Sequence, residues 1–256
     1  MNPPVVLVAT AHPDDTEFYY SGTMLLLKQA GCEIHMWNLA DGHCGSVEYS
    51  REEIIRIRAR EARDSAAVAG AVSHPALFPD LQIFYDKPSM QAVAAVIRDI
   101  RPGIILTHSP NDYMEDHQNT CRLVVTGAFA KGMPNFETIP PNKPTYPGPV
   151  RIYHAPPHGL HDGLCRRFEP DFLIDTASVM DTKRKMLACH ASQGDWLMKS
   201  QGHSFIKEME QLSRDLVGNS GLEYAEAWRR HVHLGFCPAD YDPLCQLLKA
   251  LPPREA

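Results

Sequence analysis

The sequence lacks the patterns that mark several common classes of protein. Its seven cysteines are odd in number and widely spaced, and they form no Cys-x-x-Cys pair, which argues against a disulfide framework and a cysteine-rich zinc site. No apolar run approaches the length of a membrane span, and no dense basic run accompanies the net charge of −6. We therefore expect a cytoplasmic protein with buried thiols, no membrane span and no nucleic acid partner.

Two signatures of other enzyme classes are also missing. No Gly-x-Gly-x-x-Gly follows the first apolar segment, and no Gly-x-Ser-x-Gly occurs in the chain. The first absence argues against a dinucleotide-dependent enzyme, and the second against a hydrolase with a serine nucleophile elbow. A redox or dinucleotide protein would therefore agree with this sequence only in its fold.

What the sequence does contain is an alternation of short apolar segments with segments of helical length. The first strands are expected at residues 5–9, 33–39, 77–84 and 104–108, and the first helices at 22–29, 50–70, 89–100 and 117–130. Such alternation is typical of a parallel sheet with helices on both faces. We predict a single α/β domain over residues 1–256, with a Rossmann-like three-layer α/β/α fold and a mostly parallel sheet.

One segment interrupts this alternation. Residues 134–149 contain six prolines in sixteen positions, and proline is excluded from helix interiors and central strands. The segment is predicted to be a rigid connector or a lid.

Two loops that follow expected strands concentrate histidine and aspartate. The first contains His12, Asp14 and Asp15, and the second ends in His117. A catalytic zinc ion takes three nitrogen or oxygen ligands and a water, and one His and one Asp from the first loop with one His from the second would supply them. A remaining carboxylate could act as general base. The residue types alone do not assign the two aspartates to these roles.

Several motifs together resemble the PIG-L/LmbE-like N-deacetylase superfamily over most of the chain. These are Ala-His-Pro-Asp-Asp at residues 11–15, Ser-Gly-Thr at 21–23, Arg58 with Glu61, and Asp116 with His117. The resemblance implies one zinc ion per chain, bound by His12, Asp15 and His117, with other divalent metals possible. It also implies that Asp14 is the general base.

The same resemblance implies roles for further residues and a reaction. Arg58 would contact substrate or hold the active-site loop, and Asp116 would support the site by orienting a ligating imidazole. The expected activity is hydrolysis of an N-acetyl group from an N-acetylglucosamine-type sugar or conjugate. The expected partners are this small-molecule substrate and further copies of the chain in a homo-oligomer.

One departure from the family pattern affects the mechanism. Many members have a histidine where this chain has Met114, and that histidine is linked to stabilising the tetrahedral intermediate. Methionine cannot supply a strong hydrogen bond or a proton. Tyr113, His154 and His158 are candidate substitutes. Two alternatives stay open: an amidase acting on a thiol-sugar conjugate, and a non-catalytic protein that binds a metal or a carbohydrate on the same fold.

Overall fold

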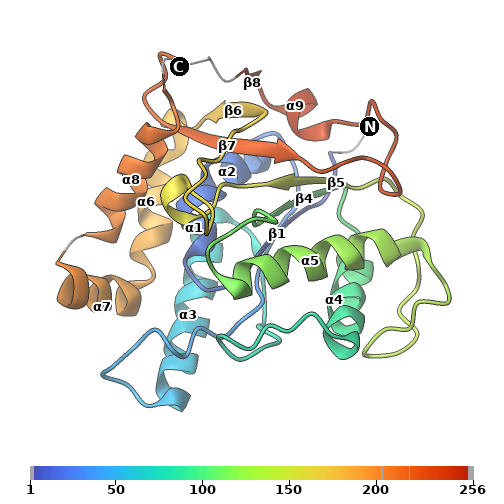
Figure 1. The fold of residues 1–256 in the computed structure, drawn as a ribbon, viewed down its shortest axis with the longest axis horizontal. Helices are drawn as coiled ribbons and strands as arrows, with labels where there is room; N and C mark the ends of the chain where they lie inside the picture. Colours follow the sequence, from blue (N-terminus) through green and yellow to red (C-terminus); the bar gives the residue numbers. More distant parts are fainter. Residues whose placement is uncertain (1–2, 203, 219, 253–256) are drawn as a thin grey trace.

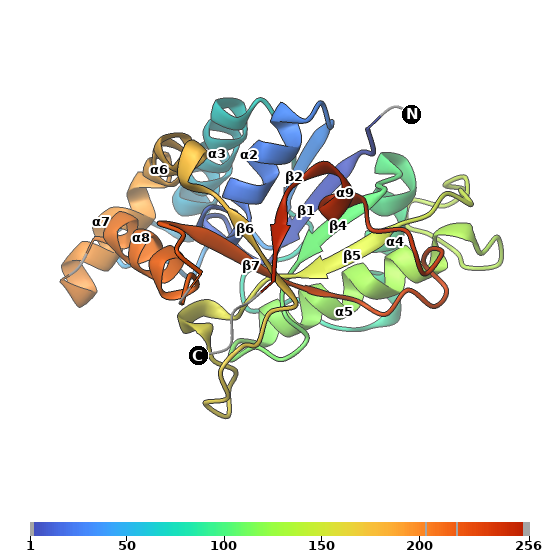
Figure 2. The same ribbon diagram turned by 90° about the horizontal axis from the view of Figure 1, so that it is seen from above.

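The computed structural model describes residues 3–202, 204–218 and 220–252, which form one sheet between helical layers (Figures 1 and 2). The strands are β1 (Val6–Thr10), β2 (Ile34–Asn38), β3 (Val72–His74), β4 (Ile104–Thr107), β5 (Arg151–His154), β6 (Phe172–Asp175), β7 (Ala225–Arg230) and β8 (Ala250–Leu251). The α-helices are α1 (Asp15–Tyr19), α2 (Ser21–Gln29), α3 (Arg51–Ala69), α4 (Lys87–Ile100), α5 (Glu115–Phe129), α6 (Met180–Ala188), α7 (Ala191–Gln201), α8 (Phe205–Asp215) and α9 (Pro243–Leu247). None of these helices is long and apolar enough to cross a bilayer.

The strand order is β3-β2-β1-β4-β5-β7-β6-β8, and the first five strands in this order are parallel. The last three pair antiparallel, with β7 inserted between β5 and β6. The predicted three-layer α/β/α fold with a mostly parallel sheet is therefore confirmed. Strand β7 was not expected, because its charged residues, Glu226 near its start and Arg229 and Arg230 at its end, interrupt the apolar pattern that marks a buried strand.

The central strand β1 explains the layering. Val6 and Val8 belong to one hydrophobic core, and Leu7 and Ala9 to the other, because alternate side chains of a strand point to opposite faces of the sheet. Helices α2, α3 and α6 cover the first face and α4 and α5 the second (Figure 2). A strand buried on both faces in this way holds the loop that follows it firmly in place.

The strand expected at residues 77–84 is wrong. The third strand comes earlier, at Val72–His74, and 77–84 is an irregular segment in which Leu81 and Phe84 are exposed. Pro79 cannot donate to a strand ladder, and Leu81 has a positive φ of 59°, so both residues oppose a strand here. The irregular backbone brings Asp80 to the carboxyl end of the sheet.

Helix α3 begins with a capping box formed by Ser50 and Glu53. The Ser50 hydroxyl accepts from the Glu53 amide, and the Glu53 carboxylate accepts from the Ser50 amide. The helix ends at Gly70, whose φ of 63° suits glycine. Both ends of α3 are thus fixed by local sequence, and the helix presents Arg58 toward the sheet.

The proline-rich segment 134–149 contains neither helix nor strand, as its composition predicts. It connects α5 to β5 and packs on α4, where Arg98 donates to the Lys143 and Met133 carbonyls. The segment thus lies against α4, and its role as a connector or a lid stays a prediction.

A buried polar network joins the carboxyl-terminal part of the sheet to α2. Glu226 on β7 accepts hydrogen bonds from the amides of Gly22 and Thr23 at 2.8 and 2.7 Å, at the start of α2. Lys183 on α6 donates to the same carboxylate at 2.6 Å and to the Phe18 carbonyl at 2.9 Å. The network satisfies the free amides of the first helical turn, and it anchors the elements that follow the first His/Asp loop.

Candidate metal centre and cleft

The two His/Asp loops meet at the carboxyl ends of β1 and β4. The first loop leads from β1 into α1, with Asp15 as the first helical residue. The second leads from β4 into α5, which places His117 in the first turn of that helix. Because β1 and β4 are adjacent and parallel, their carboxyl ends lie at the same edge of the sheet, where α/β folds bind ligands.

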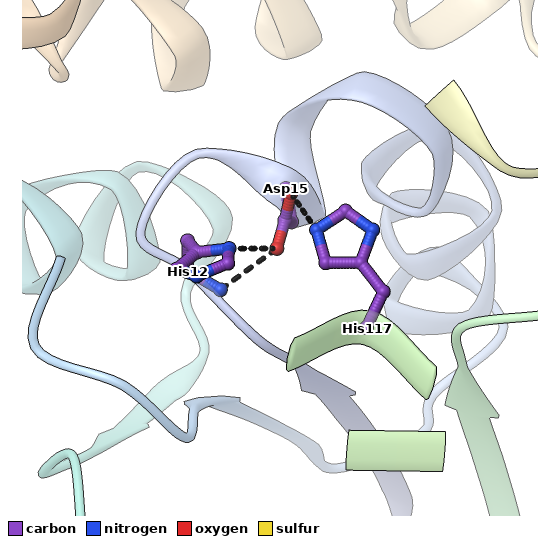
Figure 3. A group of neighbouring side chains, drawn as sticks. All are labelled: His12, Asp15 and His117. Atoms are coloured by element: carbon purple, nitrogen blue, oxygen red, sulfur yellow. Dashed lines mark hydrogen bonds and ion pairs between the residues drawn. The ribbon is translucent and has the colours of Figure 1, made fainter. Parts of the chain in front are cut away.

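His12, Asp15 and His117 come together at this edge (Figure 3). His12 Nδ1 lies 3.5 Å from Asp15 Oδ2, and His117 Nε2 lies 3.5 Å from Asp15 Oδ1. One possible ligand atom from each residue lies within 4.8 Å of the others. The His12 amide fixes the carboxylate by donating to Asp15 Oδ2 at 2.7 Å. The three side chains present the donor set of a His/Asp/His metal site.

Carboxylates also contact the far nitrogen of both imidazoles. His12 Nε2 lies 3.2 Å from Asp116 Oδ2 and 3.2 Å from Asp80 Oδ1. Asp112 Oδ1 lies 3.2 Å from Nδ1 of His117. A carboxylate in this position orients a ligating imidazole and raises its basicity. His12 Nδ1 and His117 Nε2, which face Asp15, are thereby left as the candidate metal-binding atoms.

His108 lies against this arrangement and forms, with Asp112 and His117, another group that could hold a metal ion. Its Nε2 is 2.8 Å from the Ala11 amide, which can only donate, so this nitrogen carries the lone pair. The same nitrogen lies 3.4 Å from Asp15, but the nearer amide decides its protonation state. The His108 ring stacks on that of His117 at 4.0 Å. Burial, followed by the neighbouring His117, lowers the pKa of His108, so a neutral imidazole holds the His117 ring in place.

Negative charge exceeds positive charge around the three candidate ligands. Burial opposes ionisation of His117, but Asp15 and Asp112 outweigh it and raise its pKa to about 9. Burial likewise works against ionised Asp15, and His117 and His108 overcome it and hold its pKa well below the usual value. The carboxylates grouped here are Asp14, Asp15, Asp80, Asp112 and Asp116. A divalent cation would compensate the excess, and metal binding would displace protons from the imidazoles.

Asp14 differs from Asp15 in backbone and in environment. Its φ of 105° lies in the left-handed region, which aspartate tolerates better than most residues, and its Oδ2 accepts from Arg58 at 3.1 Å. Burial raises the pKa of Asp14 to about 6 against the opposing effect of Arg58. A carboxylate with a pKa near neutrality can both accept and return a proton.

Arg58 connects three segments around the first loop. Its guanidinium donates to the Gly42 carbonyl at 2.8 Å, to the Pro13 carbonyl and to Asp14. A Cβ atom at position 42, where φ is 69°, would lie 2.5 Å from Arg58. The sequence left two roles open for Arg58, contact with substrate and support of the active-site loop. These contacts agree with the second role.

An open cleft of about 480 Å³ leads to these residues. Its walls include His12, Asp14, Asp15, Asp80, Tyr113, Met114, His117, His158, Trp196 and Glu208. Tyr113 is half exposed and its ring meets that of His117 edge-on at 5.9 Å. His158 Nε2 lies 3.1 Å from Glu208 Oε1 on the same wall. His154, the third candidate substitute for a histidine at position 114, does not line the cleft, because it is buried beneath the second loop.

The structure adds two carboxylates, Asp80 and Asp112, that were not predicted from the sequence, and it gives Asp116 a different contact from the one nearest in sequence. Asp116 contacts His12 rather than its neighbour His117, and the carboxylate beside His117 is Asp112. Asp80 was missed because it lies in the segment expected to be a strand. The sequence signal for Asp112 was its place in the second loop, four residues after His108, but no local pattern points to Asp80.

Comparison with known proteins agrees with the motifs. Residues 7–128 match the family model described as PIG-L, GlcNAc-PI de-N-acetylase. This part of the chain, a little under half of its length, is similar to the PIG-L family. The match spans both His/Asp loops and helix α3, and it ends within α5.

Curated relatives carry two kinds of activity in their names. A diacetylchitobiose deacetylase from Thermococcus kodakarensis is 29% identical over 195 residues, covering 73% of this chain and 69% of the relative. A 4-oxalmesaconate hydratase from Pseudomonas putida is 27% identical and covers 73% of each chain. A probable N-acetyl-α-D-glucosaminyl L-malate deacetylase 2 from Bacillus cereus is 25% identical and covers 87% of this chain and 96% of the relative.

Solved structures of a deacetylase and of a hydratase share the fold. The N,N′-diacetylchitobiose deacetylase of Pyrococcus horikoshii superposes with a TM-score of 0.74 at 22% identity, covering 92% of this chain and 87% of that chain. The 4-carboxy-2-hydroxymuconate hydratase of Pseudomonas putida superposes with a TM-score of 0.72 at 22% identity, covering 89% and 96%. Deacetylases and a hydratase are therefore built on one architecture, and the choice between them depends on the site.

Proposed function

We propose that this protein is a zinc-dependent N-deacetylase that hydrolyses the acetamide of an N-acetylglucosamine-type sugar. The observation that carries the proposal is the His12/Asp15/His117 set at the base of an open cleft, with Asp14 beside it. The family model is that of a de-N-acetylase, and two of the three relatives described above are named as deacetylases of N-acetylated sugars.

The residues present fit a divalent metal. Two imidazoles and one carboxylate form the donor set, both imidazoles are oriented by carboxylates, and the local charge is negative. Zinc favours this combination of nitrogen and oxygen ligands, although iron could occupy it too. Bound zinc would lower the pKa of a coordinated water and polarise the amide carbonyl.

The chain's own residues would move the proton. Asp14 lines the cleft and has a raised pKa of about 6, so it would take the proton of the attacking water and return it to the departing amine. Arg58 would hold Asp14 and the Pro13 carbonyl in position throughout. A hydrogen bond from the cleft wall would stabilise the developing oxyanion, and Tyr113 and His158 are the candidates that line the cleft.

Hydration of an unsaturated carboxylic acid is the second candidate function. The observation in its favour is the Pseudomonas putida relative, which matches this chain about as well as the deacetylases do. Addition of water to a double bond also needs a base beside a metal, but it releases no amine. Deacetylation is preferred because of the family match and because Asp14 suits protonation of an amine.

One assay separates these functions. Zinc-loaded protein of verified metal content is incubated with N-acetylglucosamine and with N,N′-diacetylchitobiose, and free amine and acetate are quantified with and without a chelator. Chelator-sensitive release of both products in equal amounts supports the proposal. Absence of acetate, together with loss of the ultraviolet absorbance of 4-oxalmesaconate, would replace it with hydration. Absence of both reactions would favour a non-catalytic binder.

Two further proposals concern the protein's setting. We propose a cytoplasmic location, supported by seven free cysteines, which suit a reducing compartment. We also propose a homo-oligomer, supported by the exposed apolar side chains of Leu77, Leu81 and Phe84, which lie in one short segment of the chain. Light scattering after size-exclusion chromatography tests the second, and a mass equal to one chain would contradict it.

A further inference from the structure

A second pocket lies at the same edge of the sheet, on the other side of the second His/Asp loop. Its volume is about 280 Å³, and it is lined where β5 and β7 pair, at His154 and Arg229. Asn111 and Pro157 line this pocket, whereas their near neighbours Tyr113 and His158 line the cleft that leads to the candidate metal ligands. The pocket and the cleft therefore flank the same two loops.

The lining of this pocket is strongly cationic. Arg166, Arg167, Arg229 and Arg230 line it, against one acidic residue, Asp162. Arg230 is neutralised by Asp242 at 2.8 Å, and Arg167 donates to a backbone carbonyl. In the described residues, no acidic side chain pairs with Arg229. The pocket thus carries more positive charge than the chain neutralises, in a protein whose net charge is −6.

Two histidines connect the pocket to the second His/Asp loop by hydrogen bonds. His154 Nδ1 donates to the His108 carbonyl at 2.7 Å. Its Nε2 is therefore the lone-pair nitrogen of a neutral ring, and it accepts from His231 Nδ1 at 2.9 Å. His108 in turn stacks on His117. A contiguous path runs from the pocket through His231, His154 and His108 to a candidate metal ligand.

The electrostatics of the two histidines agree with this geometry. Burial is the main cause that lowers the pKa of His154 to about 4, and the neighbouring His231 and Arg229 add to it. The pKa of His231 is lowered by burial and by Arg151. The pocket residue Arg229 thus adds to burial in opposing protonation of His154, and a bound anion would offset that positive charge.

We propose that this pocket binds an oxyanion, a phosphate or carboxylate group, through Arg229 and Arg166. Guanidinium groups match the geometry of both anions and bind them through paired hydrogen bonds. The volume of about 280 Å³ suits a single anionic group. The anion is either a substituent of the substrate, in which case the inference rests on the proposed function, or a separate small ligand.

Inorganic phosphate tests the binding site without reference to turnover. Calorimetric titration of the zinc-loaded protein is compared with that of Arg229→Gln and of Arg60→Gln, which removes an exposed arginine from α3 as the matched control. We expect saturable binding that weakens about 10- to 100-fold in Arg229→Gln, from the loss of a charged hydrogen bond, and is unchanged in Arg60→Gln. The imidazole NMR signals of His231 should shift on addition of phosphate.

The opposite results are equally clear. Absence of saturable binding would overturn the proposal, and so would equal affinity in all three proteins, because phosphate held by zinc would not depend on Arg229. Turnover then distinguishes the source of the anion. If the anion is part of the substrate, Arg229→Gln should raise KM for N-acetylglucosamine 6-phosphate and not for N-acetylglucosamine. If the anion is a separate ligand, phosphate should change the turnover of N-acetylglucosamine, and Arg229→Gln should abolish this response.

Discussion

Two buried polar clusters in this molecule differ in how completely they are satisfied. Lys183 and Glu226 lie 2.6 Å apart, and backbone groups of Phe18, Gly22 and Thr23 supply their further partners. In the metal centre, the imidazoles stand 3.5 Å from Asp15 and negative charge is in excess. A cluster that the chain neutralises by itself stabilises the fold, whereas a cluster that it leaves unbalanced is suited to a ligand.

Removal of a candidate metal ligand should have the largest effect and should separate the two clusters. We expect His12→Ala to bind zinc more than about 100-fold more weakly, because loss of an outer partner alone costs about 10- to 100-fold, and to lose its turnover. The fold should persist, because the Lys183–Glu226 network is untouched. Zinc content by mass spectrometry and circular dichroism check both parts. Wild-type zinc content in this variant would remove His12 from the ligand set.

Replacement of the candidate base should affect turnover alone. Asp14→Asn keeps the side-chain shape but cannot accept a proton, and we expect the rate to fall by about 10²- to 10⁴-fold, the usual contribution of a general base. Zinc content should match that of the wild type, since Asp14 lies outside the candidate ligand set. Steady-state kinetics on zinc-loaded protein measures the loss, and full activity would exclude Asp14 from proton transfer.

Disruption of the Lys183–Glu226 network should instead lower the stability of the fold. Lys183→Met leaves Glu226 buried without its cation, and such a change costs about 3–5 kcal/mol of unfolding free energy. Urea denaturation measures it. The double variant Lys183→Met/Glu226→Leu is the matched control and should recover part of the loss, because it removes the uncompensated charge. Equal stability of Lys183→Met and wild type would contradict the structural role assigned to this pair.

The smallest effect is expected from an outer carboxylate of the metal centre. Asp80→Asn weakens the contact to His12 Nε2 while Asp116 remains, so we expect zinc affinity to fall by about 10-fold, the low end for such partners. Competition with a chromogenic chelator measures the affinity. Asp86→Asn, a change at an exposed helix cap on the same connecting segment, should leave zinc affinity unchanged. An unchanged affinity in Asp80→Asn would show that Asp116 alone orients His12.

The sequence predicted the parts of the site that depend on contiguous residues. His12, Asp14 and Asp15 lie in one short loop after a buried strand, and the parallel alternation of elements brings that loop to the second one. The contact of Asp80 with His12 depends on an irregular segment far along the chain, and no periodicity predicts it. The same limit applies to β7, where the buried Glu226 interrupts the apolar pattern and only its partners on α2 and α6 explain the burial.

The position of Glu226 late in the chain also determines when the cap of α2 can form during synthesis. The carboxylate that caps α2 lies 203 positions after Thr23. A ribosome adds about 5–20 residues per second, so the start of α2 waits about 10–40 s for its partner. Over that interval the first His/Asp loop is followed by a helix whose leading amides have no protein acceptor. The nascent chain therefore carries all of its candidate metal ligands well before the scaffold that fixes them exists.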